Sequence, residues 1–341
     1  MSKYKKLFRN IILNAAQLAA VLAVTMLGKK KIYLEWGRGT GKSFILAWFM
    51  KKMVKQMPGA SFALVGSTYQ QILSRTLPST KEGLEKLGIF ENVDFVIGKN
   101  GAKNGFKSPI QAPSKWGNII HFSNGCIFQL VSLDNPDSGR GLNAYAVIGD
   151  EAALFDPKKL YNNVKTTNRA SKDEFKKCSL LGAEIYASST PVSKKGKWFT
   201  DMEQVAKKKP KVYAFIKASA KINILNLRKE WFDEMRDEAP SELLYNAEIL
   251  NIRPKEILNG FYPQLTLKNY YTDYADSNRG NREYTSVSID SSHDNDIDAT
   301  KPLILSLDWG VFLSATVAQQ YPNEYRVLKS LWVQQPKDIE D

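Results

Sequence analysis

Apolar and polar segments alternate along most of this chain in two different periods. Seven apolar runs have the length of strands, and runs with a helical period follow several of them, at 44–57, 69–87 and 197–207. The predicted strands are 32–36, 62–66, 119–122, 127–132, 144–149, 183–188 and 212–218. Strands that alternate with helices are typical of an α/β fold whose mainly parallel sheet is flanked by helices.

One of the turns departs from this alternation. Ser123-Asn124-Gly125 joins two neighbouring strand runs directly, without a helix between them. An Asn-Gly pair between apolar runs is a strong signal for a β-hairpin. We therefore expect an antiparallel addition to the parallel sheet.

The pattern changes after residue 222 and predicts four parts. Residues 1–222 form the α/β domain, and 223–262 form a helical linker in which Pro240-Ser241 starts a fresh helix. Residues 263–300, rich in Asp, Asn, Ser and Gly towards their end, are predicted to be a flexible connection. A β-rich unit follows at 301–341, with strand runs at 303–310, 314–319 and 326–333.

A glycine-rich segment lies between the first strand and its helix, where a phosphate-binding loop belongs. It consists of Gly37, Arg38, Gly39, Thr40, Gly41, Lys42 and Ser43. Such a loop points backbone N–H groups and a helix N-terminus at one place, which suits a polyphosphate such as ATP. Lys42 is then predicted to reach the β- and γ-phosphates and Ser43 to bind Mg²⁺. Trp36 stands where the motif has glycine, so a glycine-rich turn with a chance Lys-Ser is the alternative.

Two acids follow the apolar run at 145–149. Asp150 is predicted to orient Mg²⁺, and Glu151 to activate water for attack on the γ-phosphate. Arg38 can donate to γ-phosphate oxygens as charge develops there. The alternatives are an ordinary strand end for the acids and a solvent-facing cation for Arg38.

The charge of the chain favours a polyanionic partner. Lys and Arg number 48 against 35 acids, which gives a net charge of +13 in 341 residues. Nucleic acid is the partner that such a balance suits best, although lysine clusters at 29–31, 194–197 and 207–211 are also consistent with solvated faces.

Two cysteines form no metal-ligand or disulfide pattern and indicate a reducing compartment. The apolar run at 11–27 resembles a signal peptide, but Asn14 and Gln17 interrupt it, and we expect no membrane span.

These motifs together resemble the large terminase subunit of tailed bacteriophages, the motor that packages DNA into procapsids. The similarity extends over nearly the whole chain. It is carried, in the order of the family, by the loop 37–43, Ser138-Gly139-Arg140-Gly141 leading to Ile148-Gly149-Asp150-Glu151-Ala152, Ser188-Ser189-Thr190-Pro191, and Tyr245-Asn246-Ala247-Glu248-Ile249-Leu250-Asn251.

The resemblance implies roles for four of these residues. Arg38 would act in cis on the γ-phosphate, and Ser189 and Thr190 would couple hydrolysis to movement. Gln17 falls where such ATPases place an adenine-reading glutamine. From the residues alone, Ser189-Thr190 is equally well an ordinary turn, and Gln17 a polar residue of a helix.

The last unit resembles the first three strands of an RNase H-like nuclease. Its first apolar run ends in Asp308, which would be the first carboxylate for two Mg²⁺ or Mn²⁺ ions. The chain stops after the third predicted strand, where the family continues, so we expect a shortened or split gene product. The later acids Glu324, Asp338, Glu340 and Asp341 are in a turn or near the terminus, and we expect ATPase capacity without DNA cleavage.

We therefore predict a P-loop NTPase fold followed by a helical linker and the start of an RNase H-like domain. The resemblance implies an ATP-driven motor for double-stranded DNA that acts with the portal protein and the small terminase subunit. It would work as a homo-oligomeric ring on the procapsid, in the cytoplasm of the infected bacterium. A helicase or repair ATPase is one alternative, and a nucleic-acid-binding protein or nuclease with a vestigial ATP site is another.

Overall fold

The chain divides into two compact units, Met1–Pro263 and Gln264–Asp341. The structure, a computed structural model, describes residues 11–135, 138–139, 141–254, 297–298, 300–308, 314–322 and 325–332. The flexible connection predicted at 263–300 lies almost entirely outside these residues, as do Glu324, Asp338, Glu340 and Asp341.

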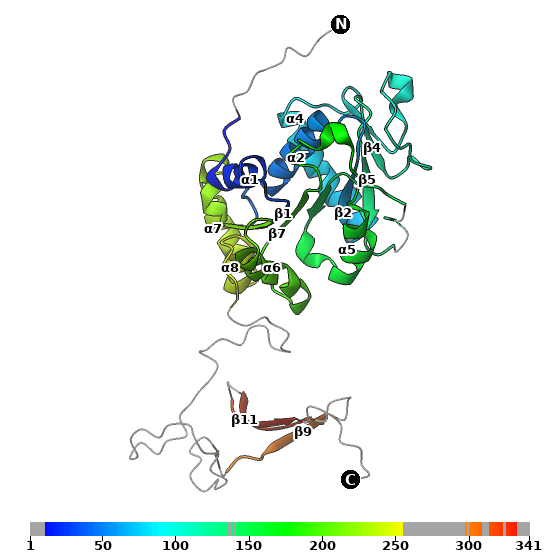
Figure 1. Cartoon of the computed structure of the whole chain (residues 1–341). Coiled ribbons are helices and arrows are strands. Elements are labelled where there is room, and N and C mark those ends of the chain that lie inside the picture. Colours follow the sequence, from blue (N-terminus) through cyan, green and yellow to red (C-terminus); the bar gives the residue numbers. More distant parts are fainter. Residues whose placement is uncertain are drawn as a thin grey trace, which may run out of the picture. The chain divides into compact units, whose positions relative to one another are not determined.

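The first unit is built on one eight-stranded sheet (Figure 1), with the order β3-β4-β5-β2-β6-β7-β1-β8. Six neighbouring strands from β5 to β8 run parallel, and β3 and β4 are added antiparallel at one edge. The strands are β1 (Lys31–Trp36), β2 (Ser61–Gly66), β3 (Phe95–Ile97), β4 (Ile119–Phe122), β5 (Ile127–Ser132), β6 (Val147–Asp150), β7 (Glu184–Ser188) and β8 (Tyr213–Ala218). The predicted α/β class with a mainly parallel sheet is confirmed.

The hairpin prediction is also confirmed. Strands β4 and β5 pair antiparallel around Gly125, whose φ of 90° is in the left-handed region that favours glycine. Strand β3 was not predicted, because three residues give too short a pattern to be recognised.

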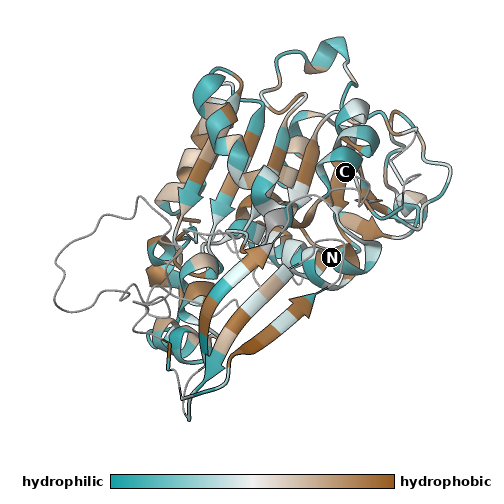
Figure 2. Cartoon of the chain, turned by 90° about the horizontal axis from the view of Figure 1, so that it is seen from below, coloured by the Kyte–Doolittle hydropathy of each residue, from teal (hydrophilic) through white to brown (hydrophobic). Residues whose placement is uncertain are grey.

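Helices cover both faces of the sheet. Helices α1 (Ala15–Thr25), α2 (Lys42–Gln56) and α4 (Leu77–Lys86) pack on one face, and α5 (Pro157–Asn163) and α6 (Lys197–Lys208) on the other (Figure 1). Alternate residues of each strand therefore enter different cores, as Leu34 and Tyr33 of β1 do. Figure 2 shows the resulting pattern, with apolar residues concentrated on the strands and polar residues along the outer sides of the helices.

The helix predicted at 69–87 is interrupted. It consists of α3 (Tyr69–Gln71), a π-helical turn η1 (Ile72–Thr76) and α4. Short 3₁₀ turns connect other elements: η2 (Gly101–Asn104), η3 (Ala152–Leu154), η4 (Lys165–Thr167), η5 (Asp173–Phe175) and η6 (Lys194–Gly196). None of the helices in the described part of the chain is long and apolar enough to cross a membrane.

A group of short helices follows β8 and packs beside the P-loop, the name we give to residues 37–43. It comprises η7 (Ala220–Asn226), α7 (Trp231–Asp237) and α8 (Glu242–Glu248), joined by a small core of Ala220, Tyr245 and Ile249. Ser241 caps α8 by accepting from the backbone N–H of Leu244, so the helix start predicted at Pro240-Ser241 is confirmed. We call residues 220–253 the linker segment.

The second unit contains an antiparallel sheet of three strands in the order β11-β10-β9. The strands are β9 (Ile304–Asp308), β10 (Ser314–Gln320) and β11 (Tyr325–Trp332). They agree with the three predicted strand runs.

Candidate functional site

Three loops meet at one edge of the sheet. Strands β6, β7 and β1 are parallel neighbours, and their carboxyl ends lead into the Asp150-Glu151 turn, Ser189-Thr190 and the P-loop. Parallel strands bring their carboxyl ends together, and this edge is where ligands bind in open α/β sheets. The structure thus brings together the residues that the sequence singled out at 37–43, 150–151 and 189–190.

The P-loop needs its glycines for two different reasons. Gly39 and Gly41 have φ values of 82° and 89°, in the left-handed region. At Gly37, a Cβ atom would lie 2.2 Å from the carbonyl oxygen of Ile249, so no larger residue fits against the linker segment. Trp36, the departure from the motif, is the fully buried last residue of β1, and its ring therefore leaves the loop unobstructed.

The loop opens onto an uncapped helix. Helix α2 has Gly41 as its N-cap without a side-chain cap hydrogen bond, and its first turn contains no acid. Its first N–H groups therefore lack intrahelical partners, while the helix dipole favours negative charge at this end. Thr40 stiffens the loop, because its buried hydroxyl donates to the Gly37 carbonyl oxygen at 2.7 Å.

The Lys42 ammonium lies at the centre of the site. It donates to the carbonyl oxygens of Trp36 and Gly37 at 2.8 and 3.1 Å. Burial lowers the pKa of Lys42, and the negative charges of Glu151 and Asp150 partly oppose this shift. The two acids predicted for catalysis therefore act electrostatically on the predicted phosphate-binding lysine.

Asp150 and Glu151 form a strained acidic turn. Asp150 is only 8% exposed, and burial together with the neighbouring Glu151 raises its pKa to about 6, although Lys42 opposes the shift. The backbone N–H of Glu151 donates to Asp150 Oδ1 at 3.0 Å. Glu151 itself has a φ of 52°, a left-handed conformation that costs about 1 kcal/mol or more for a non-glycine residue. Such strain is frequent at functional sites.

Arg38 reaches towards the linker segment. Its Nε lies 2.7 Å from Glu248 Oε2, with the two side chains 60% and 35% exposed. The backbone N–H of Arg38 also donates to the Glu248 carbonyl oxygen, at 2.6 Å. Glu248 stands in one of the motifs that carry the family resemblance, but nothing in the sequence indicates its partner.

Gln17 braces the P-loop. Its Oε1 accepts from the Asn14 backbone N–H at 3.0 Å, in a capping box at the start of α1, and its Nε2 donates to the Gly41 carbonyl oxygen at 3.2 Å. Asn14 itself donates to the Thr40 carbonyl oxygen at 3.0 Å, and Asn223 of the linker segment donates to the Gly39 carbonyl oxygen at 2.7 Å. The carbonyl groups of the loop are thus held from two sides.

Thr190 contacts Glu35, which the sequence did not single out, and Asn251, the last residue of a motif that carries the family resemblance. Its hydroxyl lies within hydrogen-bond distance of Glu35 Oε1 and Asn251 Oδ1. Glu35 in turn pairs with Arg253 at the end of the linker segment. A charged residue inside the apolar run 32–36 was the one signal in the sequence that could have identified Glu35.

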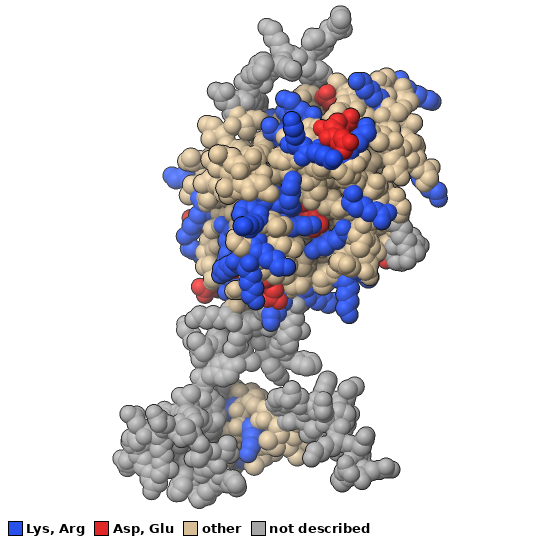
Figure 3. Space-filling model, in the orientation of Figure 1, with Lys and Arg blue, Asp and Glu red and all other residues tan. Residues whose placement is uncertain are grey.

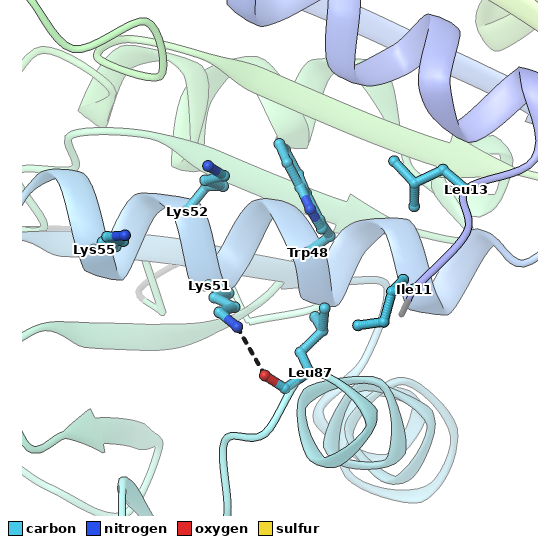
Figure 4. Close-up of a pocket in the computed structure, with 7 residues that line it drawn as sticks. All are labelled: Ile11, Leu13, Trp48, Lys51, Lys52, Lys55 and Leu87. Atoms are coloured by element: carbon cyan, nitrogen blue, oxygen red, sulfur yellow. Dashed lines mark hydrogen bonds between the residues drawn. The ribbon is translucent and has the colours of Figure 1, made fainter. Parts of the chain in front are cut away.

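A hollow lies on the outer side of α2, away from the P-loop. It has a volume of about 330 Å³ and is lined by Ile11, Leu13, Trp48, Lys51, Lys52, Lys55 and Leu87 (Figure 4). Lys51 donates to the Leu87 carbonyl oxygen at 2.7 Å, and the Lys52 ammonium lies 5.2 Å from the centre of the Trp48 ring. The residues of α2 that line it lie between Trp48 and Lys55, and none of them belongs to the P-loop.

The predicted nuclease residue Asp308 ends β9, opposite Ser314 of β10. The part of the chain that the structure describes contains no group of three or more His, Cys, Asp or Glu residues placed to hold a metal ion.

A family model connects these features to known proteins. The model described as terminase large subunit, T4likevirus-type, N-terminal matches residues 33–250, more than half of the chain. A search of curated protein sequences gave no match.

Two solved structures of a phage large terminase share the fold, and a third structure is similar to a smaller part of this chain. The large terminase of a thermophilic bacteriophage is similar over 95% of this chain and 69% of that chain, with 15% identity and a TM-score of 0.53. The ADP complex of the same phage protein is similar over 94% and 68%, with 16% identity and a TM-score of 0.50. The ATPase domain of the Thermus phage P74-26 large terminase covers 67% of this chain and 91% of its own, with 20% identity and a TM-score of 0.42.

The family model extends from β1 through the P-loop, the acidic turn and the Thr190 loop to the end of α8. The chain therefore belongs to the large terminase subunits of phages, and it contains the ATPase of this DNA-packaging motor.

Proposed function

We propose that ATP binds at the P-loop, with its β- and γ-phosphates against the N-terminus of α2 and the Lys42 ammonium. The observation that carries this proposal is the convergence on Lys42 of an uncapped helix start and the charges of Asp150 and Glu151. An anion at this position supplies the acceptors that the first N–H groups of α2 lack. The large terminase of the thermophilic bacteriophage, which shares this fold, has been solved with ADP.

Hydrolysis in this site would divide its work between two side chains. Glu151 takes a proton from the attacking water as the water oxygen bonds to the γ-phosphorus and the bond to the β-phosphate oxygen breaks. Arg38 stabilises the charge that develops on the γ-phosphate oxygens, for which it leaves Glu248. The exposure of both Arg38 and Glu248 supports this exchange, because a solvent-exposed ion pair contributes little free energy.

Oxygen ligands for Mg²⁺ are available beside the loop. Ser43 in the first turn of α2 and Asp150 at the end of β6 would hold the ion, which neutralises phosphate charge when bound. Two protein oxygens suffice for Mg²⁺ because it keeps waters and binds phosphate oxygens as well. The raised pKa of Asp150 fits this role, since a buried carboxylate next to Glu151 lacks a full counter-charge of its own.

Gln17 would belong to the nucleotide site through the loop that it holds. Its Nε2 already donates one hydrogen to the Gly41 carbonyl oxygen, and the second hydrogen of this amide is the group that would contact adenine.

Double-stranded DNA is the proposed polyanionic substrate. Figure 3 shows Lys and Arg side chains over much of one face of the first unit. The cluster at 29–31 is occupied by contacts inside the protein, since Lys29, Lys30 and Lys31 bond to Pro210, Ser179 and Glu184. Among the lysines at 207–211, Lys207 pairs with Glu203, whereas Lys208, Lys209 and Lys211 are exposed at the end of α6 and just after it. These three are the better candidates for phosphate contacts, which suit a motor because they carry no sequence information.

We further propose that the second unit begins an RNase H-like nuclease in which Asp308 binds Mg²⁺ or Mn²⁺. The position of Asp308 at the end of β9, in a three-stranded antiparallel sheet, supports this assignment. Family membership supports a ring of subunits on the procapsid, with the portal protein and the small subunit as partners in the bacterial cytoplasm.

The Lys42→Ala variant should lose nucleotide binding without losing the fold. We expect ATP affinity to fall about 10- to 100-fold, because a charge-assisted contact to phosphate is removed. Thermal unfolding with and without Mg²⁺-ATP measures this, and only the parent protein should be stabilised. Lys52→Ala, on the same helix but outside the loop, is the control. A normal ATP-induced stabilisation of Lys42→Ala would contradict the P-loop assignment.

The Glu151→Gln variant should bind ATP and fail to hydrolyse it. The amide keeps the size of the side chain but cannot accept the proton, so we expect kcat to fall about 10²- to 10⁴-fold with little change in ATP affinity. Phosphate release and equilibrium binding give the two numbers. Glu174→Gln, an exposed acid distant in sequence, controls for loss of charge. Turnover close to that of the parent would move the base to another residue.

Arg38→Ala and Glu248→Gln should change different constants, kcat in the first variant and ATP affinity in the second. Without Arg38, kcat should fall about 10²-fold or more while ATP affinity changes little. Without the Glu248 carboxylate, Arg38 no longer has to break an ion pair before it contacts phosphate. An exposed ion pair contributes little free energy, so ATP affinity should rise only about two- to fivefold. Steady-state kinetics on both variants decides this. A loss confined to ATP affinity in Arg38→Ala would make Arg38 a binding residue only.

Asp150→Asn should stabilise the protein in the absence of nucleotide and Mg²⁺. The folded carboxyl keeps its proton up to pH of about 6, whereas the unfolded chain releases it near pH 4, so the parent loses stability as pH rises between these values. At about pH 7.5 the variant should gain up to about 3 kcal/mol, and at about pH 4 almost nothing. Chemical denaturation at both pH values tests this, with the exposed Asp201→Asn as control. An equal effect at both would contradict the assigned cause.

A further inference from the structure

Glu35 is a fully buried carboxylate beside the P-loop, and the proposed chemistry gives it no task. Among the described residues the buried acids are Glu35, Asp150 and Glu184. Asp150 belongs to the acidic turn, and Glu184 starts β7 at the opposite edge of the sheet, where it pairs with Lys31. Glu35 lies in β1 directly before Trp36, whose carbonyl oxygen accepts from Lys42.

Arg253 satisfies most of the hydrogen-bonding capacity of Glu35. Its Nε lies 2.9 and 3.1 Å from the two carboxylate oxygens, and Nη2 lies 2.5 Å from Oε2. The same guanidinium pairs through Nη1 with Glu203 of α6 at 2.7 Å and lies 5.5 Å from the centre of the Phe215 ring in β8. One side chain at the end of the linker segment thus contacts β1, α6 and β8.

Thr190 connects the same carboxylate to the linker segment by a second route. Its hydroxyl oxygen lies 3.2 Å from Glu35 Oε1 and is also bonded to Asn251 Oδ1. A hydroxyl has a single hydrogen, so it cannot bond fully to both oxygens, and its choice depends on where Glu35 and Asn251 lie. Thr190 is 2% exposed, which excludes solvent as a competing partner.

Two ion pairs of different character therefore join β1 and the P-loop to the linker segment. The Arg38–Glu248 pair is exposed, and phosphate can replace it at small cost. The Arg253–Glu35 pair has one fully buried partner, and breaking it would leave a buried charge without a counter-charge. A change at the P-loop can therefore break the Arg38–Glu248 ion pair while the Arg253–Glu35 ion pair remains formed.

We propose that Arg253 and Glu35 are positioning residues that fix the end of the linker segment to the P-loop strand and carry changes of nucleotide state to residues 249–253. These are almost the last described residues before the second unit, so Arg253 follows the residues of the proposed ATP site along the chain and precedes the second unit. The inference rests on the proposed function, since it requires ATP at the P-loop.

Backbone hydrogen exchange with and without a slowly hydrolysed ATP analogue tests the proposal, together with steady-state ATPase kinetics. In the full chain, the analogue should slow exchange in 37–43 and change it in 245–253. Arg253→Lys keeps the charge but loses the forked contact. It should keep the response at 37–43, lose the response at 245–253, and lower kcat about tenfold with little change in KM.

A second variant and a control keep the test decisive if Arg253→Lys folds poorly. The Glu35→Gln/Arg253→Gln double variant removes both charges and leaves no buried charge unpaired, and it should give the same loss of response. Arg228→Gln breaks the exposed Arg228–Glu234 pair in the same linker segment and should respond like the parent.

Two different results would contradict the proposals, and each points to a different one. If the parent shows no protection at 37–43, the ATP site itself is wrongly assigned. If Arg253→Lys or the double variant transmits the response to 245–253 as the parent does, ATP binds but the positioning role of Arg253 and Glu35 is wrong.

Discussion

Parallel pairing of β6, β7 and β1 is the constraint on which the site depends. The register places Glu35 beside Ser188 and brings Asp150 beside Ala187, so the strands end together and their loops share one edge. No single loop contains the complete set of groups. Lys42 supplies positive charge, the Asp150-Glu151 turn supplies carboxylates, and Thr190 follows the strand between them.

Burial gives these charges their chemical character. The pKa of Lys42 is lowered and that of Asp150 is raised by the same removal from water, and each partly offsets the shift of the other. Perturbed pKa values of this kind cluster at functional sites. The left-handed backbone at Glu151 adds strain at the same place.

The linker segment packs directly against the P-loop. A Cβ atom at Gly39 would lie 2.9 Å from the Trp231 ring, and the Gly37 position is closed by the Ile249 carbonyl oxygen. Asn223, Glu248 and Arg253 add polar contacts along the same side of β1 and the loop. A movement of the P-loop would therefore act on the linker segment through direct contacts. The buried Glu35 carboxylate, through Arg253, holds one end of that segment in place.

The sequence by itself determined the elements and the positions of the candidate site residues. Apolar periodicity located seven strands of the main sheet, Asn124-Gly125 located the hairpin, and the spacing of 37–43 and 150–151 identified the loop and the acids, because each is a pattern of adjacent residues.

Only the tertiary structure decided which distant groups meet. Glu35 and Arg253 are 218 positions apart, and neither has a local pattern that names its partner. The structure likewise separated Lys30 and Lys31, which bond to Ser179 and Glu184, from Lys208, Lys209 and Lys211, which are exposed. Charge content is visible in a sequence, but the burial and pairing that give a charge its role arise only when the strands are assembled.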